Sequence, residues 1–187
     1  MKLIWSFYLC LLCATVAGQQ IPEQLWKQTF YSIDSFKIEM SHYQGKPLIL
    51  AMLDAGNPDK QALRLLDSIN KAPAPNFSVI GIPLTDFNMP RSKASLLKML
   101  RDSSAISFPL TGLGRAKNDS GMVIHMLIKW LSAGTDKMNH YKVSIDDAGQ
   151  FFFIDAEGKL YAILGRQALN APGLLKSVLS ASSNHHK

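Results

Sequence analysis

The amino-acid sequence predicts an α/β fold in which helices cover both faces of a central mixed β-sheet. A continuous apolar run at residues 47–53 indicates a strand that is buried on both faces. A helical pattern and a second apolar run at 77–83 follow, which is the order of a right-handed parallel crossover. Two strand-like segments at 150–155 and 159–164 indicate an antiparallel hairpin.

The first 18 residues are typical of a secretory signal peptide. Lys2 precedes an apolar run at residues 3–16, and we expect cleavage after the small residue Gly18. The run is too short for a membrane span, which needs roughly 20 apolar residues. We therefore expect an exported protein, periplasmic or secreted, with no stable membrane insertion after cleavage. A retained N-terminal anchor is the alternative.

The remaining chain has the composition of one globular domain. Of the 187 residues, 47% are hydrophobic and 18% are charged, which is sufficient for a buried core. We expect residues 19–182 to form a single domain and 183–187 a disordered tail. The net charge of +6 comes from scattered lysines and arginines, so no nucleic-acid partner is expected.

Before the first buried strand, the sequence predicts a polar lead-in at residues 19–27 and then a hairpin. Two short β-prone runs at 30–33 and 36–40 flank the turn residues Asp34 and Ser35.

The buried strand at 47–54 is expected to end at a sharp corner. Gly56 interrupts the pattern, and Asn57 as N-cap with Pro58 at the first helical position predicts the start of a helix. Apolar residues at helical spacing define its buried face. They are Ala62, Leu65, Leu66 and Ile69.

Two further helices are predicted in the middle of the chain. The first covers residues 91–101 after Pro90, and the second covers 122–131 and ends at Gly134. The first helix is expected to bury three leucines, Leu96, Leu97 and Leu100. A short extended piece at 108–110 lies between the two helices.

The C-terminal part is predicted to be a hairpin followed by a helix. Gly158 favours a tight turn between the last two strands. Asn170 and Pro172 then cap and begin a helix with an apolar face of Leu174, Leu175, Val178 and Leu179. This order of elements is that of a thioredoxin-like fold.

Several segments, in the correct order, resemble the glutathione peroxidase family. They are MSHYQGKPLIL at 40–50, VIGIPLTDFN at 79–88, FPL at 108–110, NDSG at 118–121, HMLIKWL at 125–131 and FFIDAEGK at 152–159. The resemblance implies a glutathione-peroxidase-like version of the fold and, by descent, reduction of peroxides.

The catalytic residues that the resemblance implies are absent from this sequence. The family's nucleophilic cysteine or selenocysteine would fall near Ala55, Gly56 or Asn57, none of which can attack a peroxide oxygen. The only cysteines are Cys10 and Cys13, inside the expected signal peptide. A working peroxidase would require one of these two thiols to remain and to reach the corner.

The resemblance also places the family's glutamine near Asp86 and its tryptophan–asparagine pair near Asp147 and Ala148. In the family, these polar groups form hydrogen bonds that stabilise the charged chalcogen. Acidic residues at such positions would instead raise the pKa of a thiol by like-charge repulsion.

Asp54 and Asp86 follow neighbouring parallel strands and therefore offer an alternative chemistry. Their carboxylates could meet at the carboxyl edge of the sheet and act as an acid–base pair or hold a cation. A helix cap and a loop turn are the plainer interpretation of the same residues. No cofactor and no bound metal is otherwise expected.

The sequence therefore predicts an exported glutathione-peroxidase-like protein that has lost its peroxidatic thiol and serves as a binding or scaffold module for an unknown protein or peptide. The alternatives are an enzyme with recruited carboxylate or metal chemistry, and a peroxide-reducing member of the family.

Overall fold

The computed structural model describes residues 22–73, 77–103, 106–117, 124–138, 145 and 147–181. The expected signal peptide with Cys10 and Cys13 and the expected tail lie outside these residues. Within them, no helix is both long enough and apolar enough to cross a membrane.

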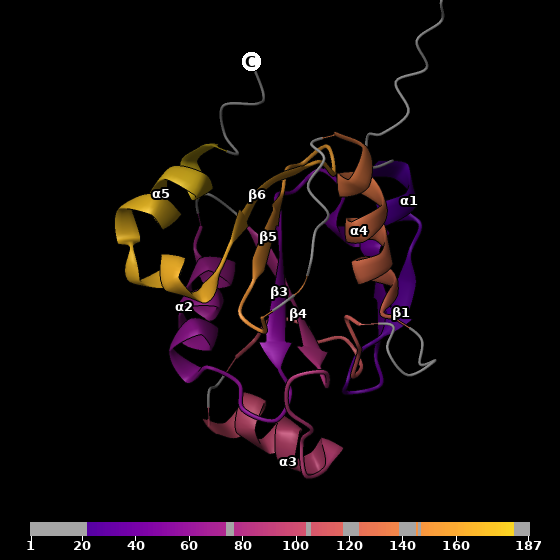
Figure 1. Cartoon of the computed structure of the whole chain (residues 1–187), viewed down its shortest axis with the longest axis vertical. Helices are drawn as coiled ribbons and strands as arrows, with labels where there is room; N and C mark the ends of the chain where they lie inside the picture. Colours follow the sequence, from indigo (N-terminus) through magenta and orange to yellow (C-terminus); the bar gives the residue numbers. More distant parts are fainter. Residues whose placement is uncertain are drawn as a thin grey trace, which may run out of the picture.

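The helices and strands follow one another as the α/β prediction requires (Figure 1). They are α1 (Pro22–Trp26), β1 (Thr29–Tyr31), β2 (Lys37–Glu39), β3 (Leu48–Asp54), α2 (Lys60–Lys71), β4 (Ser78–Leu84), α3 (Lys93–Leu97), α4 (Met126–Met138), β5 (Phe151–Ile154), β6 (Leu160–Leu164) and α5 (Pro172–Ala181). A 3-10 turn (Met40–Tyr43), a π-helical turn (Lys98–Ser103) and a second 3-10 turn (Arg166–Asn170) complete the description.

The central sheet is mixed and has the strand order β4-β3-β5-β6. β3 pairs in parallel with β4, whereas β5 is antiparallel to both β3 and β6. The turn between β5 and β6 contains Gly158 at a φ of +86°, a conformation that glycine adopts without steric cost. The predicted crossover and the predicted C-terminal hairpin are both confirmed.

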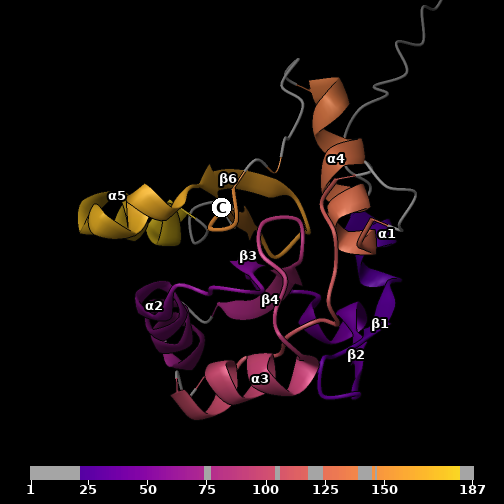
Figure 2. The same cartoon turned by 60° about the horizontal axis from the view of Figure 1, so that its bottom comes forward.

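Alternate residues of the central strands face two separate hydrophobic clusters, which makes the domain three layers thick. On β3, Ile49, Ala51 and Leu53 belong to the cluster that includes residues of α2, α3 and α5. The intervening Leu50 and Met52 belong to the cluster that includes residues of α1 and α4. Figures 1 and 2 show α2 and α5 on one side of the sheet and α1 and α4 on the other. The prediction of a strand buried on both faces is confirmed, because every residue of β3 is buried.

The first helix after β3 begins later than predicted. Its N-cap is Asp59, whose carboxylate accepts the N–H groups of Gln61 and Ala62 at 2.9 and 3.2 Å. Asn57 is not the cap; it lies in the corner before the helix, where its N–H donates to Asp54 Oδ1 at 3.1 Å. Two donors for one carboxylate make Asp59 the stronger cap.

The helix predicted at 91–101 is divided into two types of helix. α3 begins after Ser92, which forms a capping box with Ser95, and after Leu97 the chain changes to the π-helical turn. Leu96 and Leu100 are buried as expected, whereas Leu97 is half-buried.

The boundaries of α4 were predicted incorrectly, and for α5 the first residue was correct but the cap was not: Asn170 lies in the second 3-10 turn, and Ala171 directly precedes the helix. α4 starts at Met126 rather than 122 and continues through Gly134 to Met138, since a single glycine in a helix costs only about 1 kcal/mol. Residues 122 and 123 lie outside the described part of the chain. α5 begins at Pro172 as predicted, but Leu174 is 48% exposed, so the buried face is narrower than expected.

The N-terminal hairpin is confirmed, and with the segment after the π-helical turn it covers the outer side of β4. Gly81 in β4 donates to the carbonyl of Pro109, and Thr111 donates back to the carbonyl of Gly81, at 3.0 and 2.9 Å. Beyond this segment, Ile33 donates to the carbonyl of Leu110 at 3.0 Å, which ties in the hairpin of β1 and β2.

Gly81 is required by this close approach. A Cβ at this position would lie 2.6 Å from Leu110 Cδ2 and 2.9 Å from Leu53 Cδ1. We predict that Gly81→Ala lowers the free energy of unfolding by about 1–3 kcal/mol, the usual cost of overpacking a core. Denaturant unfolding measures the change. Gly173→Ala in α5 is the matched control, since its Cβ would meet no atom within 4 Å; an equal loss in both variants would contradict the prediction.

Candidate functional site

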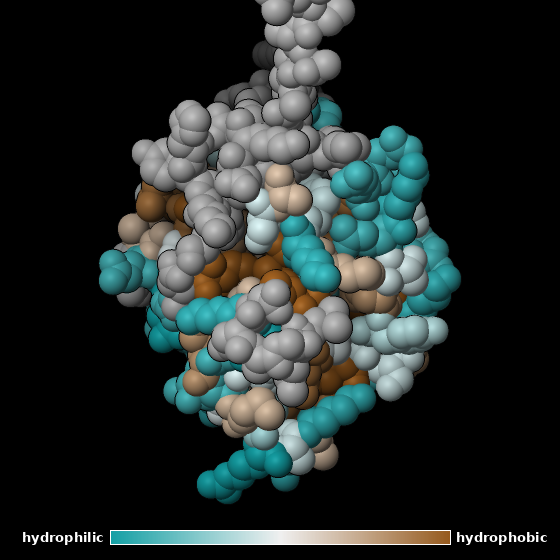
Figure 3. Space-filling model, turned by 45° about the vertical axis from the view of Figure 1, so that its right-hand side comes forward, coloured by the Kyte–Doolittle hydropathy of each residue, from teal (hydrophilic) through white to brown (hydrophobic). Residues whose placement is uncertain are grey.

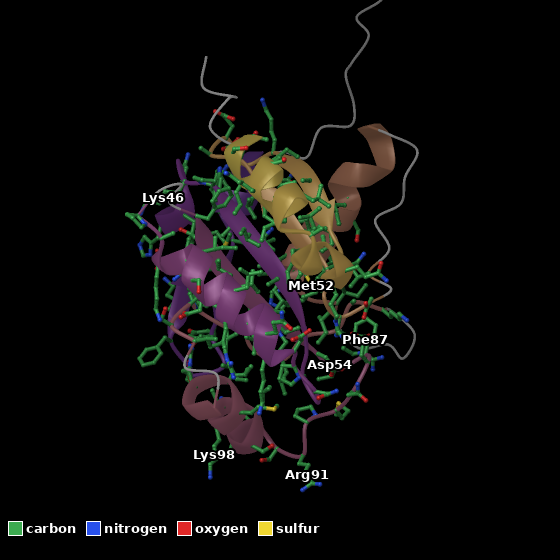
Figure 4. The ribbon with its side chains drawn as sticks, turned by 90° about the vertical axis from the view of Figure 1, so that its left-hand side faces the viewer. Lys46, Met52, Asp54, Phe87, Arg91 and Lys98 are labelled. Carbon is green, nitrogen blue, oxygen red and sulfur yellow. The ribbon has the colours of Figure 1, made fainter. Side chains whose placement is uncertain are left out.

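The candidate site lies at the carboxyl ends of β3 and β4. The corner that follows β3 ends at the N-cap of α2, and the turn that precedes β5 comes to the same end of the sheet, since Met52 donates to the carbonyl of Gln150 at 2.9 Å. Figure 4 shows Asp54 and Phe87 at this end of the molecule and Lys46, which precedes β3, at the other. This is the edge at which open α/β sheets bind ligands.

Asp54 organises the corner. It is the last residue of β3 and only 9% exposed. Its Oδ1 accepts the N–H groups of Gly56 and Asn57 at 3.0 and 3.1 Å, and its Oδ2 accepts Asn88 Nδ2 at 2.6 Å. The carboxylate thus closes the turn after β3 and holds the loop that follows β4 against it.

The three positions where the resemblance puts a nucleophile form this turn. Ala55 is fully buried and donates to the carbonyl of Leu84 at 3.0 Å, whereas Asn57 is exposed. Gly56 packs directly on Asn88, since a Cβ at position 56 would lie 2.5 Å from Asn88 Cβ. None of the three side chains carries a group that can act as a nucleophile.

Asp86 binds a different loop. Its side chain is 1% exposed and accepts the N–H groups of Ala116 and Lys117 at 2.6 and 3.1 Å. The guanidinium of Arg115 supplies a countercharge, with Nε 3.3 Å from Oδ1. With these donors the Asp86 side chain fixes residues 115–117 beside the end of β4.

Asp147 and Ala148 lie in the turn before β5. Asp147 is exposed and Ala148 is buried, and the carbonyl of Ala148 accepts Arg166 Nη2 at 3.0 Å. Arg166 Nε also lies 3.8 Å from the carboxylate of Asp59. Arg166 therefore links this turn to the N-cap of α2, a contact that nothing in the sequence pattern predicted.

Asp54 and Asp86 are thus each engaged by their own loop. The hydrogen bonds of Asp54 go to the corner and to Asn88, and those of Asp86 go to residues 115–117. Among the residues that the structure describes, no group of three histidine, cysteine or acidic side chains could hold a metal ion. Asp54 closes a turn and is not the expected helix cap, since Asp59 caps α2, whereas Asp86 anchors a loop.

His125 is a further polar residue near this end of the sheet. It immediately precedes α4, and its Nδ1 accepts the N–H of Leu127 at 3.3 Å. The ring packs edge-on against Phe30 and over Gly114, where a Cβ would lie 3.1 Å from the histidine Cβ. Burial lowers the pKa of His125 to about 4, so the imidazole is neutral at pH 7.

Comparison with known proteins supports the fold. No family model and no curated protein sequence matches this chain. Among solved structures, GPX1 of T. cruzi is 15% identical with a TM-score of 0.57, and the match covers 82% of this chain and 95% of that one.

Two thiol–disulfide proteins are similar at the same level. A thiol:disulfide interchange protein of the thioredoxin family from Chlorobium tepidum is 14% identical, with a TM-score of 0.55 over 81% of this chain and 92% of that one. A secreted disulfide oxidoreductase of Mycobacterium tuberculosis, homologous to E. coli DsbE, is 13% identical, with a TM-score of 0.53 over 85% and 98%. The chain has a thioredoxin-like fold with distant structural similarity to both kinds of protein.

We predict that His125 makes the protein less stable in acid. The unfolded chain binds a proton to this histidine near pH 6.5 and the folded chain only near pH 4, so the free energy of unfolding falls as the pH is lowered through this window. The loss from this group should reach about 2–3 kcal/mol at pH 4.

His125→Asn provides the comparison, because asparagine can accept the same cap hydrogen bond without titrating. Urea unfolding of both proteins at pH 7, 5.5 and 4 measures the difference between their pH dependences. Parallel pH dependences of the two proteins would contradict the prediction.

Proposed function

We propose that this protein is an exported thioredoxin-like binding module that has no thiol peroxidase or disulfide exchange activity. The observation that carries the proposal is that two carboxylates of the chain itself already accept the N–H groups of the corner. In redox proteins of this fold class, a thiolate at a helix N-terminus is stabilised by backbone N–H groups. Here the N–H groups of Gly56 and Asn57 are bound by Asp54, and those of Gln61 and Ala62 are bound by Asp59.

The electrostatics of the corner support the same proposal. A carboxylate already occupies the place where a redox protein would stabilise its thiolate, so a second anion there would be repelled. The sequence contains no cysteine beyond Cys13. The chain passes from a strand to a helix at this corner, as it does in redox proteins of this fold class. The similar structures are named for thiol–disulfide or GPX proteins, but no residue of this corner carries a thiol.

A binding role is supported by apolar side chains around the same end of the sheet. Met89, Leu113 and Met126 are 75%, 43% and 46% exposed. Each follows or precedes a residue that contacts this edge of the sheet. Asn88 donates to Asp54, Gly114 donates to the carbonyl of Pro83, and His125 packs over Gly114. We call these three residues the edge hydrophobics. Figure 3, which turns the side with α4 toward the viewer, shows hydrophobic surface between hydrophilic patches.

We predict no turnover of hydrogen peroxide or of organic hydroperoxides with glutathione or thioredoxin as reductant, and no reduction of insulin disulfides. Asn57→Cys is the matched variant, since it adds an exposed thiol to the corner. Its thiol pKa should be no lower than that of a free cysteine, about 8.5, because the Asp54 carboxylate lies beside it. Metal-free wild-type protein with turnover above the buffer rate would overturn the proposal.

The binding half of the proposal is tested by capture. Immobilised protein is exposed to an extract and culture medium of its own host, and the enriched proteins are quantified. We expect the wild type to capture a partner protein. The double variant Met89→Asp/Leu113→Asp should recover at least about tenfold less of it, because burying charges in a desolvated contact is costly. Leu174→Asp, an equally exposed leucine on α5, is the control. Equal capture by all three proteins would contradict the proposal.

A further inference from the structure

A pocket of about 230 Å³ lies between the N-terminal hairpin, the 3-10 turn Met40–Tyr43 and the π-helical turn. None of its lining residues belongs to the corner after β3 or to the edge hydrophobics. The walls combine charged side chains with apolar ones. They are Ser32, Asp34, Phe36, Lys37, Ile38, Glu39, His42, Tyr43, Arg101 and Pro109.

A strained turn forms one side of this pocket. Ser35, at the tip of the hairpin, has a φ of +69°, a left-handed conformation that is unfavourable for a serine. Ser32 holds the turn closed, since its N–H donates to the carbonyl of Phe36 at 2.7 Å and its Oγ accepts the N–H of Phe36 at 2.9 Å. The turn places Asp34 and Phe36 at the pocket, and the Phe36 side chain stays 72% exposed. Strain of this kind is characteristic of binding sites.

Arg101 fixes the opposite side. Its Nη1 donates to the carbonyls of Ile106 and Phe108, both at 3.0 Å, and its Nη2 donates to Asp34 Oδ2 at 2.6 Å. The residue lies in the π-helical turn, a feature that often marks functional sites. With these bonds made, the guanidinium braces the pocket and is poorly placed to recognise an anion.

Two carboxylates of the pocket, Asp34 and Glu39, each keep an oxygen to which no described residue donates a hydrogen bond. Asp34 uses only Oδ2 for Arg101. Glu39 binds Lys37 through Oε1, and its Oε2 lies 3.9 Å from His42 Nε2, beyond hydrogen-bond distance. Two carboxylates therefore keep an oxygen available, whereas the lysine and the arginine are already paired.

We propose that this pocket binds a small protonated amine that carries an aromatic or branched apolar group. The ammonium would donate to Asp34 and Glu39, and the apolar group would lie against Phe36, Ile38 and Pro109. A volume below the 300–1,000 Å³ of ordinary ligand pockets limits the ligand to about the size of an amino acid. A free amine and the amino terminus of a peptide share this chemistry. The inference does not depend on whether the corner is redox-active.

The test is an NMR titration of the isotope-labelled protein with three probes of one shape: 2-phenylethylamine, 2-phenylethanol and 3-phenylpropionate. We expect the amine to cause saturable shifts in the amides of residues 32–39 and 101, with a Kd at least about tenfold below that of the alcohol, the gain from charge-assisted hydrogen bonding. A tripeptide with the same aromatic residue at its free amino terminus, compared with its acetylated form, separates the peptide source from the free amine.

Asp34→Asn should weaken amine binding about tenfold, whereas Asp147→Asn, an exposed aspartate in the turn before β5, should leave it unchanged. If Asp34→Asn fails to fold, Phe36→Ala decides, because this exposed side chain should affect binding but not folding. Equal binding of the carboxylate probe, shifts that map to residues 54–59, or unchanged affinity in Phe36→Ala would overturn the inference.

Discussion

The carboxylate of Asp54 is the group on which the arrangement of this molecule's candidate site depends. It terminates the central strand, closes the turn that leads to α2 and holds the loop after β4 through Asn88. These bonds join the end of β3, the turn that leads to α2 and the loop after β4. In a parallel crossover, these three segments meet at one edge of the sheet. Because the carboxylate is almost fully buried, these donors replace the hydrogen bonds that water would otherwise make to it.

The same contacts occupy the N–H groups of the corner after β3. The positive end of α2 and the N–H groups of the corner are a general device for holding an anion. In this chain the anions are Asp54 and Asp59, which are part of the fold itself. The N–H groups of this corner therefore stabilise the fold, which supports the proposed role in binding.

Much of the fold could be predicted from sequence because the strands carry their signal locally. The unbroken apolar run of β3 and the Gly158 turn each depend on neighbouring residues alone. The exact start of α2 could not be predicted, because Asn57 and Asp59 are both good caps and only the structure shows that Asp59 accepts the N–H groups of Gln61 and Ala62. The same applies to the site: the positions of Asp54 and Asp86 follow from the strand order, but their partners Asn88 and Arg115 come from other loops.

The segment at residues 108–111 has a consequence for how the protein behaves among copies of itself. An open strand edge is a template for pairing with other chains. β4 would be such an edge, but the N–H and carbonyl of Gly81 are bound by this segment, and Gly114 donates to the carbonyl of Pro83 at 2.9 Å. The N–H of Val79 donates to Asn70 Oδ1 at 3.0 Å. The hairpin of β1 and β2 lies beyond this segment, where Ile33 donates to the carbonyl of Leu110. Strand addition that would lead to aggregation is therefore blocked along β4, at the side of the sheet where the two longest strands lie.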